Sequence, residues 1–479
     1  MRLKLLSLSV MTIGAAALSG QALASGYNFG SQSVSAQGTA HANAAEAADP
    51  STIYYNPAGL SELDGTQMQF GVTAVLPDSS YTDSGSHRFN SGATGLGTSG
   101  SATNSSFVPS SVVVPNFYLS HKLDDRFTIG LGVFVPYGAK LNYGTDSVTR
   151  YALESINLQS VNFNPSISFK LDEHNSFGFG VSAQYMKASL QKAVDVGTGI
   201  FGLGARFGAA AIPGLGGVTG NMLMAAAPGL GDGQVKLDAD GWGFGFNLGY
   251  LFKLDDHTRF GLAYRSKIRT KLTGTANWDY SNVGGGALSP AVLGIINSGS
   301  HLTSSANTTV DTPQSASASF YRDLTDKLAV MSTVTWWGHS AMQNITVNFD
   351  RANEGPMTIN QNWKDSWTYA LGANYKVNDA LMLRTGVAYE QSPVPNDNLR
   401  HVALPDSDRT WLSLGANYKF DKKQSVDFAY SYIWFKNANV NYVDNCNPAG
   451  TTCTGNGETT SGSFKTHMQM IGLAYNYRF

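Results

Sequence analysis

Large apolar residues alternate with small or polar residues over long stretches of this chain, as in β-strands that bury one face. The clearest stretch carries a bulky side chain at every second position: Trp242, Phe244, Phe246, Leu248, Tyr250 and Phe252. Residues 176–185 and 425–434 repeat the pattern. The alternating stretches reach roughly 12–18 residues, far beyond the usual strand of about 5–6 residues. A tilted strand that crosses a bilayer needs about 9–11 residues within it, so the pattern predicts membrane strands and disfavours a soluble sandwich.

Short turns of similar sequence join these stretches in pairs, and much longer connections separate the pairs. Six such turns are recognisable, at residues 122–127, 170–174, 253–257, 323–328, 376–381 and 420–424. Short turns on one rim and long loops on the other are typical of bacterial outer-membrane barrels. Six inner turns and seven outer loops require fourteen strands, so we predict an all-β fold, a 14-stranded antiparallel transmembrane β-barrel. The strands are expected at residues 67–76, 112–122, 127–137, 157–170, 175–190, 236–253, 257–275, 308–322, 327–349, 363–376, 380–391, 408–420, 425–440 and 465–479.

The first 24 residues predict a secretory signal peptide. Arg2 and Lys4 supply the positive start, residues 5–17 the apolar core, and Ala22-Leu23-Ala24 a small-residue cleavage site. The apolar core is too short for a membrane anchor, and no later stretch approaches the roughly 18 unbroken apolar residues of a membrane helix. We therefore expect an exported mature protein that begins at Ser25.

Residues 25–65 are rich in alanine and serine and leave little room for a spanning strand. A large barrel encloses a channel unless something fills it. We therefore predict that residues 25–65 form an N-terminal hatch, or plug, inside the lumen, and that residues 66–479 form the barrel.

Two predicted outer loops, residues 193–234 and 283–302, are apolar where outer loops are usually hydrophilic. Exposed apolar surface of this kind often marks a binding site. The loops therefore either capture a hydrophobic ligand or pack on each other as a lid, and both interpretations can hold together.

Composition narrows the class of protein further. Charged residues make up 14% of the chain, against roughly 25% in soluble proteins, and a net charge of −2 argues against a nucleic-acid partner. Cys446 and Cys453 lie close together in an outer-loop candidate, and we predict a disulfide between them, as is usual in exported proteins. A metal site would need further ligands nearby, so we expect no metal and no cofactor.

Several segments resemble the FadL/TodX family of outer-membrane transporters over essentially the whole mature chain. They are residues 54–60 (Tyr-Tyr-Asn-Pro-Ala-Gly-Leu), 114–116, 136–138, 240–247 and 264–266, and the pair 392–395 with 405–409. The resemblance implies a 14-stranded barrel with an N-terminal hatch, in agreement with the strand count. It also implies passive transport of hydrophobic small molecules across the bacterial outer membrane. The ligand would be caught by the apolar outer loops and would leave sideways through an inward kink of the third strand, gated by the hatch.

The resemblance assigns gating roles to individual residues. Asn56, Pro57 and Ala58 match the hatch motif, where proline fixes a tight turn. Gly138 matches the kink of the third strand, where a residue without Cβ lets the strand bend inward.

The resemblance also assigns residues that would bind the substrate. Tyr27, as the third mature residue, matches an aromatic residue that inserts into the binding pocket, and Lys192 matches a basic residue that would meet a fatty-acid carboxylate. The family's second basic position falls in residues 357–362, which contain no basic residue. Long-chain fatty acids are therefore the first expected substrate, with neutral hydrocarbons or aromatics of the toluene type as the alternative.

One further feature follows from alternation alone. If Phe260, Leu262, Tyr264 and Ile268 face lipid, then a ladder of four cations faces the lumen: Arg265, Lys267, Arg269 and Lys271. Neighbouring cations repel unless acids compensate them. The candidate acids are Glu46, Asp49, Glu390 and Asp427. We predict that the ladder grips the hatch and has a secondary role in attracting anions.

Other functions fit the sequence less well. A general porin would have an open lumen, which the predicted hatch opposes, and a lipase would need a serine nucleophile with an oriented histidine. The histidines are scattered and there is no Gly-x-Ser-x-Gly elbow, so we expect no catalytic residues and no enzyme. An adhesin or phage-receptor role for the outer loops remains open. We expect a monomer that contacts outer-membrane lipid and lipopolysaccharide and enters the membrane through insertion machinery that recognises the C-terminal Phe479.

Overall fold

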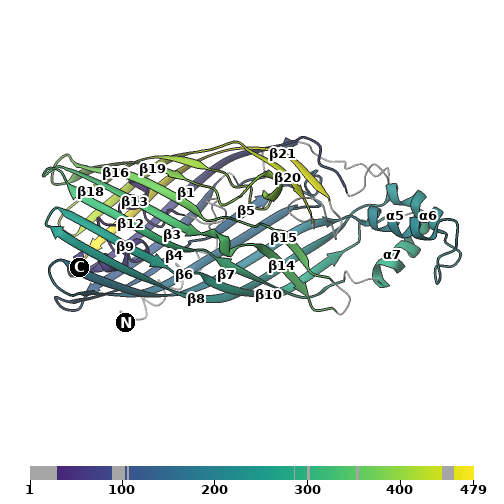
Figure 1. The fold of residues 1–479 in the computed structure, drawn as a ribbon, viewed down its shortest axis with the longest axis horizontal. Helices are drawn as coiled ribbons and strands as arrows, with labels where there is room; N and C mark the ends of the chain where they lie inside the picture. Colours follow the sequence, from purple (N-terminus) through teal and green to yellow (C-terminus); the bar gives the residue numbers. More distant parts are fainter. Residues whose placement is uncertain are drawn as a thin grey trace.

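The computed structural model describes residues 30–88, 103–104, 107–109, 111–284, 286–298, 302–351, 355–444 and 458–479. The predicted signal peptide, Tyr27, Cys446 and Cys453 lie outside the described residues. The described chain forms one elongated antiparallel β-barrel with a small helical group at one end (Figure 1). None of the helices within the described residues is both long enough and apolar enough to cross a membrane.

The barrel is closed, because β1 (Thr66–Asp83) pairs along its length with β21 (Thr459–Arg478). The wall has fourteen strands, as predicted. Between the two closing strands lie, in order, β3 (Val112–Lys122), β4 (Phe127–Phe134) with β5 (Gly138–Asn142), β6 (Ser155–Lys170), β7 (Asn175–Val194), β8 (Gly233–Asp255), β9 (Thr258–Arg265) with β10 (Ile268–Asp279), β11 (Ser304–Thr312) with β12 (Gln314–Asp323), β13 (Leu328–Gly338) with β14 (Asn344–Phe349), β15 (Met357–Asn360) with β16 (Ser366–Lys376), β17 (Leu381–Glu390), β18 (Arg409–Lys419), and β19 (Gln424–Phe435) with β20 (Ala438–Val443).

Short elements complete the fold. A two-residue strand, β2 (Thr103–Asn104), pairs with the outer end of β1. The helical elements are α2 (Val34–Gly38), α3 (Thr52–Tyr55), η1 (Pro57–Glu62), α5 (Val196–Phe207), α6 (Gly220–Ala226), η2 (Ala227–Gly229), η3 (Gly286–Leu288), α7 (Ser289–Ser298), η4 (His339–Ala341) and η5 (Asp397–Leu399).

The repeated inner turns share one hydrogen-bonding scheme. In the first turn, Asp124 Oδ1 accepts from the backbone N–H of Arg126 and Phe127, both at 2.8 Å. An aspartate or asparagine does the same at the corresponding position of other inner turns, including Asp172 and Asn378. Short polar side chains that bond the backbone two or three residues on are what tight turns require, which explains the repeated Lys-Leu-Asp sequence.

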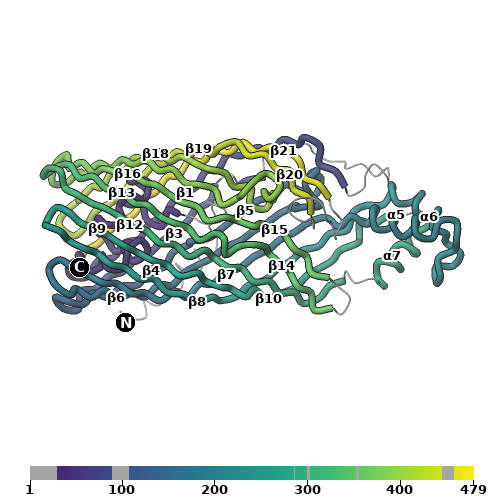
Figure 2. The backbone as a smooth tube through the Cα atoms, viewed as in Figure 1, coloured from purple at the N-terminus to yellow at the C-terminus, as the bar shows by residue number. Residues whose placement is uncertain are grey.

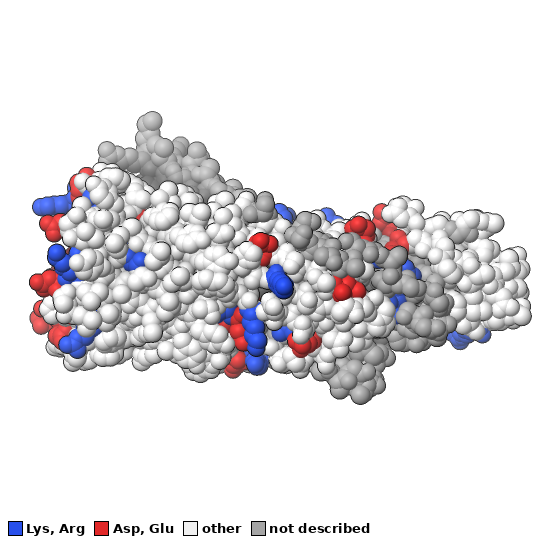
Figure 3. All heavy atoms as spheres, turned by 90° about the horizontal axis from the view of Figure 1, so that it is seen from above, with Lys and Arg blue, Asp and Glu red and all other residues white. Residues whose placement is uncertain are grey.

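An apolar belt surrounds the barrel. On β8 the outward positions are the charged Lys236, Asp238 and Asp240 near the outer end, and then bulky apolar residues from Trp242 onward. Phe244 is 69% exposed, so these side chains face away from the lumen. On the face drawn in Figure 3, charged side chains gather at one end and in a band near the middle, with a mostly uncharged surface between them. This belt matches the thickness that roughly 9–11 residues of a tilted strand can cross.

Residues 30–65, called here the lumenal segment, lie inside the barrel (Figure 2). Contacts reach the wall on opposite sides, since Gln37 Nε2 donates to the carbonyl of Met470 on β21 and Asn247 on β8 donates to the carbonyl of Ile53. Thr333 on β13 donates to the carbonyl of Ala42. Most side chains of the segment are buried, so it packs closely inside the barrel, and its role as a hatch stays a prediction.

The structure corrects the predicted basic ladder. Arg265 faces the lumen, but Lys267, Arg269 and Lys271 face outward, and the side chain of Arg269 is 68% exposed. The inward positions of β10 belong to the buried Ile268 and its alternate neighbours.

An extra residue between β9 and β10 causes this reversal. On β8, Asn247 pairs with Arg265 of β9 and Asp240 pairs with Thr273 of β10. The segment from Arg265 to Thr273 is one residue longer than the segment from Asp240 to Asn247 that it faces. Because side chains alternate with a period of two, one inserted residue exchanges the inward and outward faces of everything beyond it. Arg269 and Lys267 instead pair with the outward Asp311 on β11, at 2.9 Å and 3.4 Å.

Candidate functional site

The outer half of the lumen contains an apolar pocket with a cavity volume of about 90 Å³. Its lining comes from seven neighbouring strands, β6, β7, β8, β10, β11, β14 and β15, and from the segment after η5. Most of the lining side chains are aliphatic: Ile156, Leu158, Ala188, Leu190, Leu237, Ala239, Leu272, Ala306, Val310, Met342, Ile345, Val347, Ile359, Ala403 and Leu404. Ser189, Asp238, Thr275, Asn307 and Thr308 complete the lining. Such a lining suits a hydrocarbon chain or ring.

The pocket exists because the lumen changes character along each strand. On β7 the inward positions near the lumenal segment are Ser182 and Gln184, and those farther out are Met186, Ala188 and Leu190. The same change occurs along β6, from polar residues to Leu158 and Ile156. The sequence signal for this pocket is the presence of apolar residues at inward positions near the outer ends of the strands. We did not identify this signal from the sequence alone.

The third strand of the wall is interrupted beside the pocket. The ladder between β3 and β4 ends at the pair Phe117–Val133, and within the described residues the ladder of β5 is formed with β6. The interruption falls between Phe134 and Gly138, where the sequence predicted a kink. Pro136 lacks an N–H for the ladder, which gives the local reason for a break.

One cluster of packed apolar residues joins the interruption to the wall of the apolar pocket. Tyr137 and Ala139 belong to the same cluster of buried apolar residues as Leu158, Leu272 and Leu404 of the pocket wall. The interruption and the pocket wall therefore share their apolar packing.

The Asn-Pro-Ala turn of the lumenal segment fits against glycines of the wall. A Cβ atom added to Gly178 on β7 would lie 2.2 Å from the backbone nitrogen of Ala58. One added to Gly249 on β8 would lie 2.2 Å from Asn56 Oδ1. Asn56 Nδ2 also donates to the carbonyl of Tyr250 at 3.0 Å. The predicted gating residues are thus seated directly on the wall, and their movement stays a prediction.

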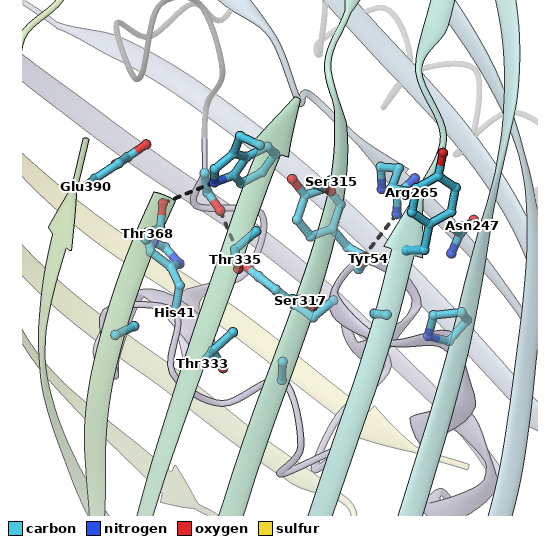
Figure 4. Close-up of a pocket in the computed structure, with 18 of the residues that line it drawn as sticks. His41, Tyr54, Asn247, Arg265, Ser315, Ser317, Thr333, Thr335, Thr368 and Glu390 are labelled. Carbon is cyan, nitrogen blue, oxygen red and sulfur yellow. Dashed lines mark hydrogen bonds between the residues drawn. The ribbon is translucent and has the colours of Figure 1, made fainter. Parts of the chain in front are cut away.

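A second cavity, called here the chamber, lies between the lumenal segment and the wall, with a volume of about 80 Å³ (Figure 4). His41, Tyr54 and Tyr55 contribute to it from the segment. The wall contributes Arg265 and a set of polar and aromatic residues. They are Asn247, Tyr264, Ser315, Ser317, Thr333, Thr335, Trp337, Thr368, Glu390 and Trp411. The lining of the chamber therefore contains more polar side chains than that of the outer pocket.

Arg265 contacts the lumenal segment, as was predicted for the residues of the basic ladder. Its guanidinium donates to the carbonyl of Tyr54 at 3.1 Å and lies 4.8 Å from the centre of the Tyr54 ring. Arg259, which the sequence analysis did not identify, also grips the segment by donating to the carbonyl of Glu46 at 2.8 Å. The acids proposed as partners of the ladder have other roles; Asp427, for example, pairs with Arg384.

Lys192 lies in the lumen near the outer end of β7, but its charge is already neutralised. Its Nζ lies 3.1 Å from Asp444 Oδ2, and its side chain is 13% exposed. Glu458 is also buried beside Asp444, and burial together with the charge of Asp444 raises the pKa of Glu458 to about 8. Lys192 does not line the apolar pocket or the chamber, and its predicted contact with a ligand carboxylate stays a prediction.

The two apolar outer loops pack on each other. Val196, Ile200 and Leu223 from the first loop form one cluster with Val283 and Val292 from the second. Figure 1 shows α5, α6 and α7 projecting together beyond one end of the barrel. The lid-like packing is thus present, and Met222, 44% exposed on α6, adds apolar surface that faces outward.

Comparisons with known proteins agree with this architecture. A family model described as outer membrane protein transport protein (OMPP1/FadL/TodX) matches residues 15–479. An outer membrane protein of Neisseria meningitidis serogroup B is 34% identical over 481 residues, covering 98% of this chain and 98% of the relative.

Two further relatives carry more specific descriptions. The long-chain fatty acid transport protein of Escherichia coli (strain K12) is 27% identical over 438 residues, covering 90% of this chain and 93% of the relative. The crystal structure of a Pseudomonas aeruginosa FadL homologue aligns with a TM-score of 0.76 at 26% identity, covering 95% of this chain and 99% of that structure.

Proposed function

Because this chain belongs to the OMPP1/FadL/TodX family of outer-membrane transport proteins for hydrophobic compounds, we propose that it passively imports long-chain fatty acids. The family assignment confirms the resemblance drawn from the sequence and places the protein in the bacterial outer membrane. The choice of fatty acid is the proposal. It is supported by the similarity to the Escherichia coli long-chain fatty acid transport protein.

The proposed route has three stages. The apolar surface of the outer loops collects the ligand, the apolar pocket holds it, and the interruption of the third strand releases it sideways toward the membrane. Lateral release is physically favourable, because a hydrophobic molecule that left through the inner mouth would have to cross the chamber, whose lining is more polar than that of the pocket. The lumenal segment, seated on Gly178 and Gly249, acts in this proposal as the gate.

One observation carries the proposal, namely that a single buried apolar cluster joins the wall of the apolar pocket to the strand interruption. Leu158 and Leu272 line the pocket and belong to the same buried cluster as Tyr137 and Ala139 at the interruption. A general porin would not need an aliphatic pocket beside a break in its wall.

Filling the pocket tests this function. Ala188 lines the pocket on β7, and Ala188→Trp is expected to occupy the space that an acyl chain needs. Uptake of radiolabelled palmitate by a deletion strain should fall about tenfold, as loss of roughly 1.4 kcal/mol of binding implies. Val181→Trp is the matched control, because Val181 lies on the same strand but faces lipid and is 44% exposed.

The outcome of this pair of variants is decisive for the route. Unchanged uptake by a folded Ala188→Trp barrel would contradict passage through the pocket. Equal loss in both variants would show that a new tryptophan on β7 disturbs the barrel as a whole.

Neutral hydrocarbons of the toluene type are the second candidate. The observation that favours them is the near absence of charged side chains from the lining of the apolar pocket. Competition between palmitate and toluene for the purified protein would separate the two, because a hydrocarbon channel should bind toluene and release it independently of pH.

A further inference from the structure

Charged side chains gather on the outer surface of the barrel, on the outer halves of β7, β8, β10 and β11 and in the link between β9 and β10. They are called here the charged patch. The cations are Lys187, Lys236, Lys267, Arg269 and Lys271, and the acids are Asp238, Asp240 and Asp311. The inserted residue between β9 and β10 brings three of these cations to the outer surface, because it turns the predicted lumenal ladder outward.

Positive charge exceeds negative charge within the patch. Asp311 on β11 is the acidic partner of two cations, Arg269 at 2.9 Å and Lys267 at 3.4 Å. Lys236 pairs with Asp238 on its own strand at 3.2 Å. Five cations therefore share three carboxylates, which leaves a surplus of two positive charges at neutral pH.

Two lysines of the patch have their charged groups open to an external anion. Within the part of the chain that the structure describes, neither Lys187 nor Lys271 has a carboxylate within ion-pair distance. Lys187 is exposed and lies opposite Asp240 in the ladder between β7 and β8, without an ion pair between the two side chains. Lys271 is exposed and lies opposite Thr309 on β11, which offers a hydroxyl beside it.

Exposed aromatic rings border the patch. The next outward positions along β8 are Trp242 and Phe244, whose side chains are 52% and 69% exposed. β10 passes close beside them, since a Cβ atom added to Gly241 would lie 2.1 Å from the carbonyl oxygen of Lys271. The cations of the patch therefore lie directly at the edge of the apolar belt.

This position and this chemistry define one kind of ligand. The patch lies on the loop-bearing side of the belt, so it meets the headgroup region of the outer leaflet. The lipid of that leaflet is lipopolysaccharide, whose lipid anchor is an acylated disaccharide with phosphate groups. Its phosphates complement the surplus positive charge, and its acyl chains complement the rings of Trp242 and Phe244.

We propose that the charged patch and the apolar belt beside it form a binding site for lipopolysaccharide, with Lys187 and Lys271 as phosphate ligands. Cationic side chains form strong charge-assisted hydrogen bonds with phosphate oxygens, and clusters of Lys and Arg beside a membrane-spanning region attract anionic headgroups. Asp311 fixes the orientation of Arg269 by accepting from both Nε and Nη2 of its guanidinium. The site is independent of the proposed transport, because it lies on the face of the wall that is turned away from the lumen.

Replacing the two lysines that have no ion pair tests the site without removing any ion pair of the barrel. The test variant is Lys187→Gln/Lys271→Gln. The matched control is Lys327→Gln/Lys376→Gln, which removes the same charge from two exposed lysines at the inner rim. Binding of fluorescently labelled lipid A with two phosphates is measured with the full-length protein in detergent micelles, and melting temperatures check that each variant is folded.

The patch variant should bind lipid A about tenfold more weakly than the wild type, the effect expected when charge-assisted contacts are lost. The control variant should bind as the wild type does. Unchanged affinity of the folded patch variant, or an equal loss in the control variant, would overturn the proposal.

Unlabelled competitors separate this site from a general site for anions or for anionic lipids. Dephosphorylated lipid A should compete about tenfold less well than lipid A, because the cations lose their partners. Inorganic phosphate lacks acyl chains and should not compete at the same concentration, and phosphatidylglycerol, which has a single phosphate, should compete less well than lipid A. Competition equal to that of lipid A by any of these three compounds would overturn the proposal.

Discussion

Arg259 and Arg265 lie on the same strand and both hold the lumenal segment, yet their surroundings differ. Arg259 has Glu62 Oε2 at 3.7 Å, whereas Arg265 faces only neutral groups and the chamber. The two residues are equivalent by alternation, so the sequence pattern alone does not distinguish the arginine with a nearby carboxylate from the one that contacts only neutral groups. What separates them is the packing of a segment that lies far away in the chain.

The acidic cluster at the outer end of the lumen yields a prediction about pH. The unfolded chain releases the proton of Glu458 near pH 4.5 and the folded protein near pH 8, so the folded state binds that proton more tightly. The stabilising contribution is therefore complete below about pH 4.5 and is lost as the pH rises to about 8. Because each pKa unit corresponds to about 1.4 kcal/mol, the loss is on the order of a few kcal/mol.

Melting temperatures of the wild type and Glu458→Gln across this pH range check the prediction. The glutamine variant should be as stable as the wild type in acid and more stable in alkali. Parallel pH profiles for the two proteins would show that Glu458 titrates normally. Asp444 and Lys192, which face Glu458, and Asp195 farther along the same mouth stay unchanged in the comparison.

At the scale of strands, alternation predicted most strands of the wall. It failed where one strand contains an extra residue relative to the strand it pairs with. The strands predicted at 112–122 and 380–391 correspond closely to β3 and β17. The single strand predicted at 257–275 is interrupted at residues 266–267. After the interruption, the side chains predicted to face the lumen face outward, and those predicted to face lipid face the lumen. An inserted residue leaves both halves with good alternation, so the pattern of one strand does not reveal it; the register of the neighbouring strand does.

The candidate site was predictable in part. The Asn-Pro-Ala turn and the break before Gly138 were found by resemblance, because they depend on local backbone chemistry. The apolar pocket and the chamber were missed, because each is assembled from single inward positions on many strands. Outward-facing and pocket-facing leucines look alike in a sequence until the register of the whole barrel is known.

The glycines under the Asn-Pro-Ala turn give a prediction at the element scale. Gly178→Ala would place a Cβ atom 2.2 Å from the Ala58 nitrogen and 2.3 Å from the Pro57 carbonyl carbon. The atoms that the new Cβ would meet belong to the backbone of the lumenal segment, which cannot change rotamer as a side chain can. The lumenal segment must therefore move. Overpacking of this kind costs roughly 1–3 kcal/mol, and we expect a lower melting temperature together with larger ion currents in planar bilayers.

Gly199→Ala is the control for that experiment. Gly199 lies on α5, and a Cβ atom there would have no neighbour within 4 Å. If Gly178→Ala conducts and melts as the control does, then the lumenal segment is not seated as tightly as the structure indicates.

At the scale of the whole molecule, the barrel has different surroundings on its two faces and along its axis. The outer surface carries a belt of apolar side chains between two charged zones (Figure 3). The lumenal segment packs inside the barrel, and the chamber has a more polar lining than the pocket. The wall is interrupted near the pocket, at the point where the proposed route would leave the lumen.

The most direct test of this account is photo-crosslinking in intact outer membranes with a long-chain fatty acid that carries a diazirine group on its chain, followed by mapping of the labelled residues. The account predicts labelling of pocket residues such as Leu158, Leu272 and Leu404, with loss of that labelling in excess unlabelled palmitate. Labelling confined to lipid-facing residues such as Phe244, Leu248 and Leu262 would contradict it, because the fatty acid would then contact the barrel only as a component of the bilayer.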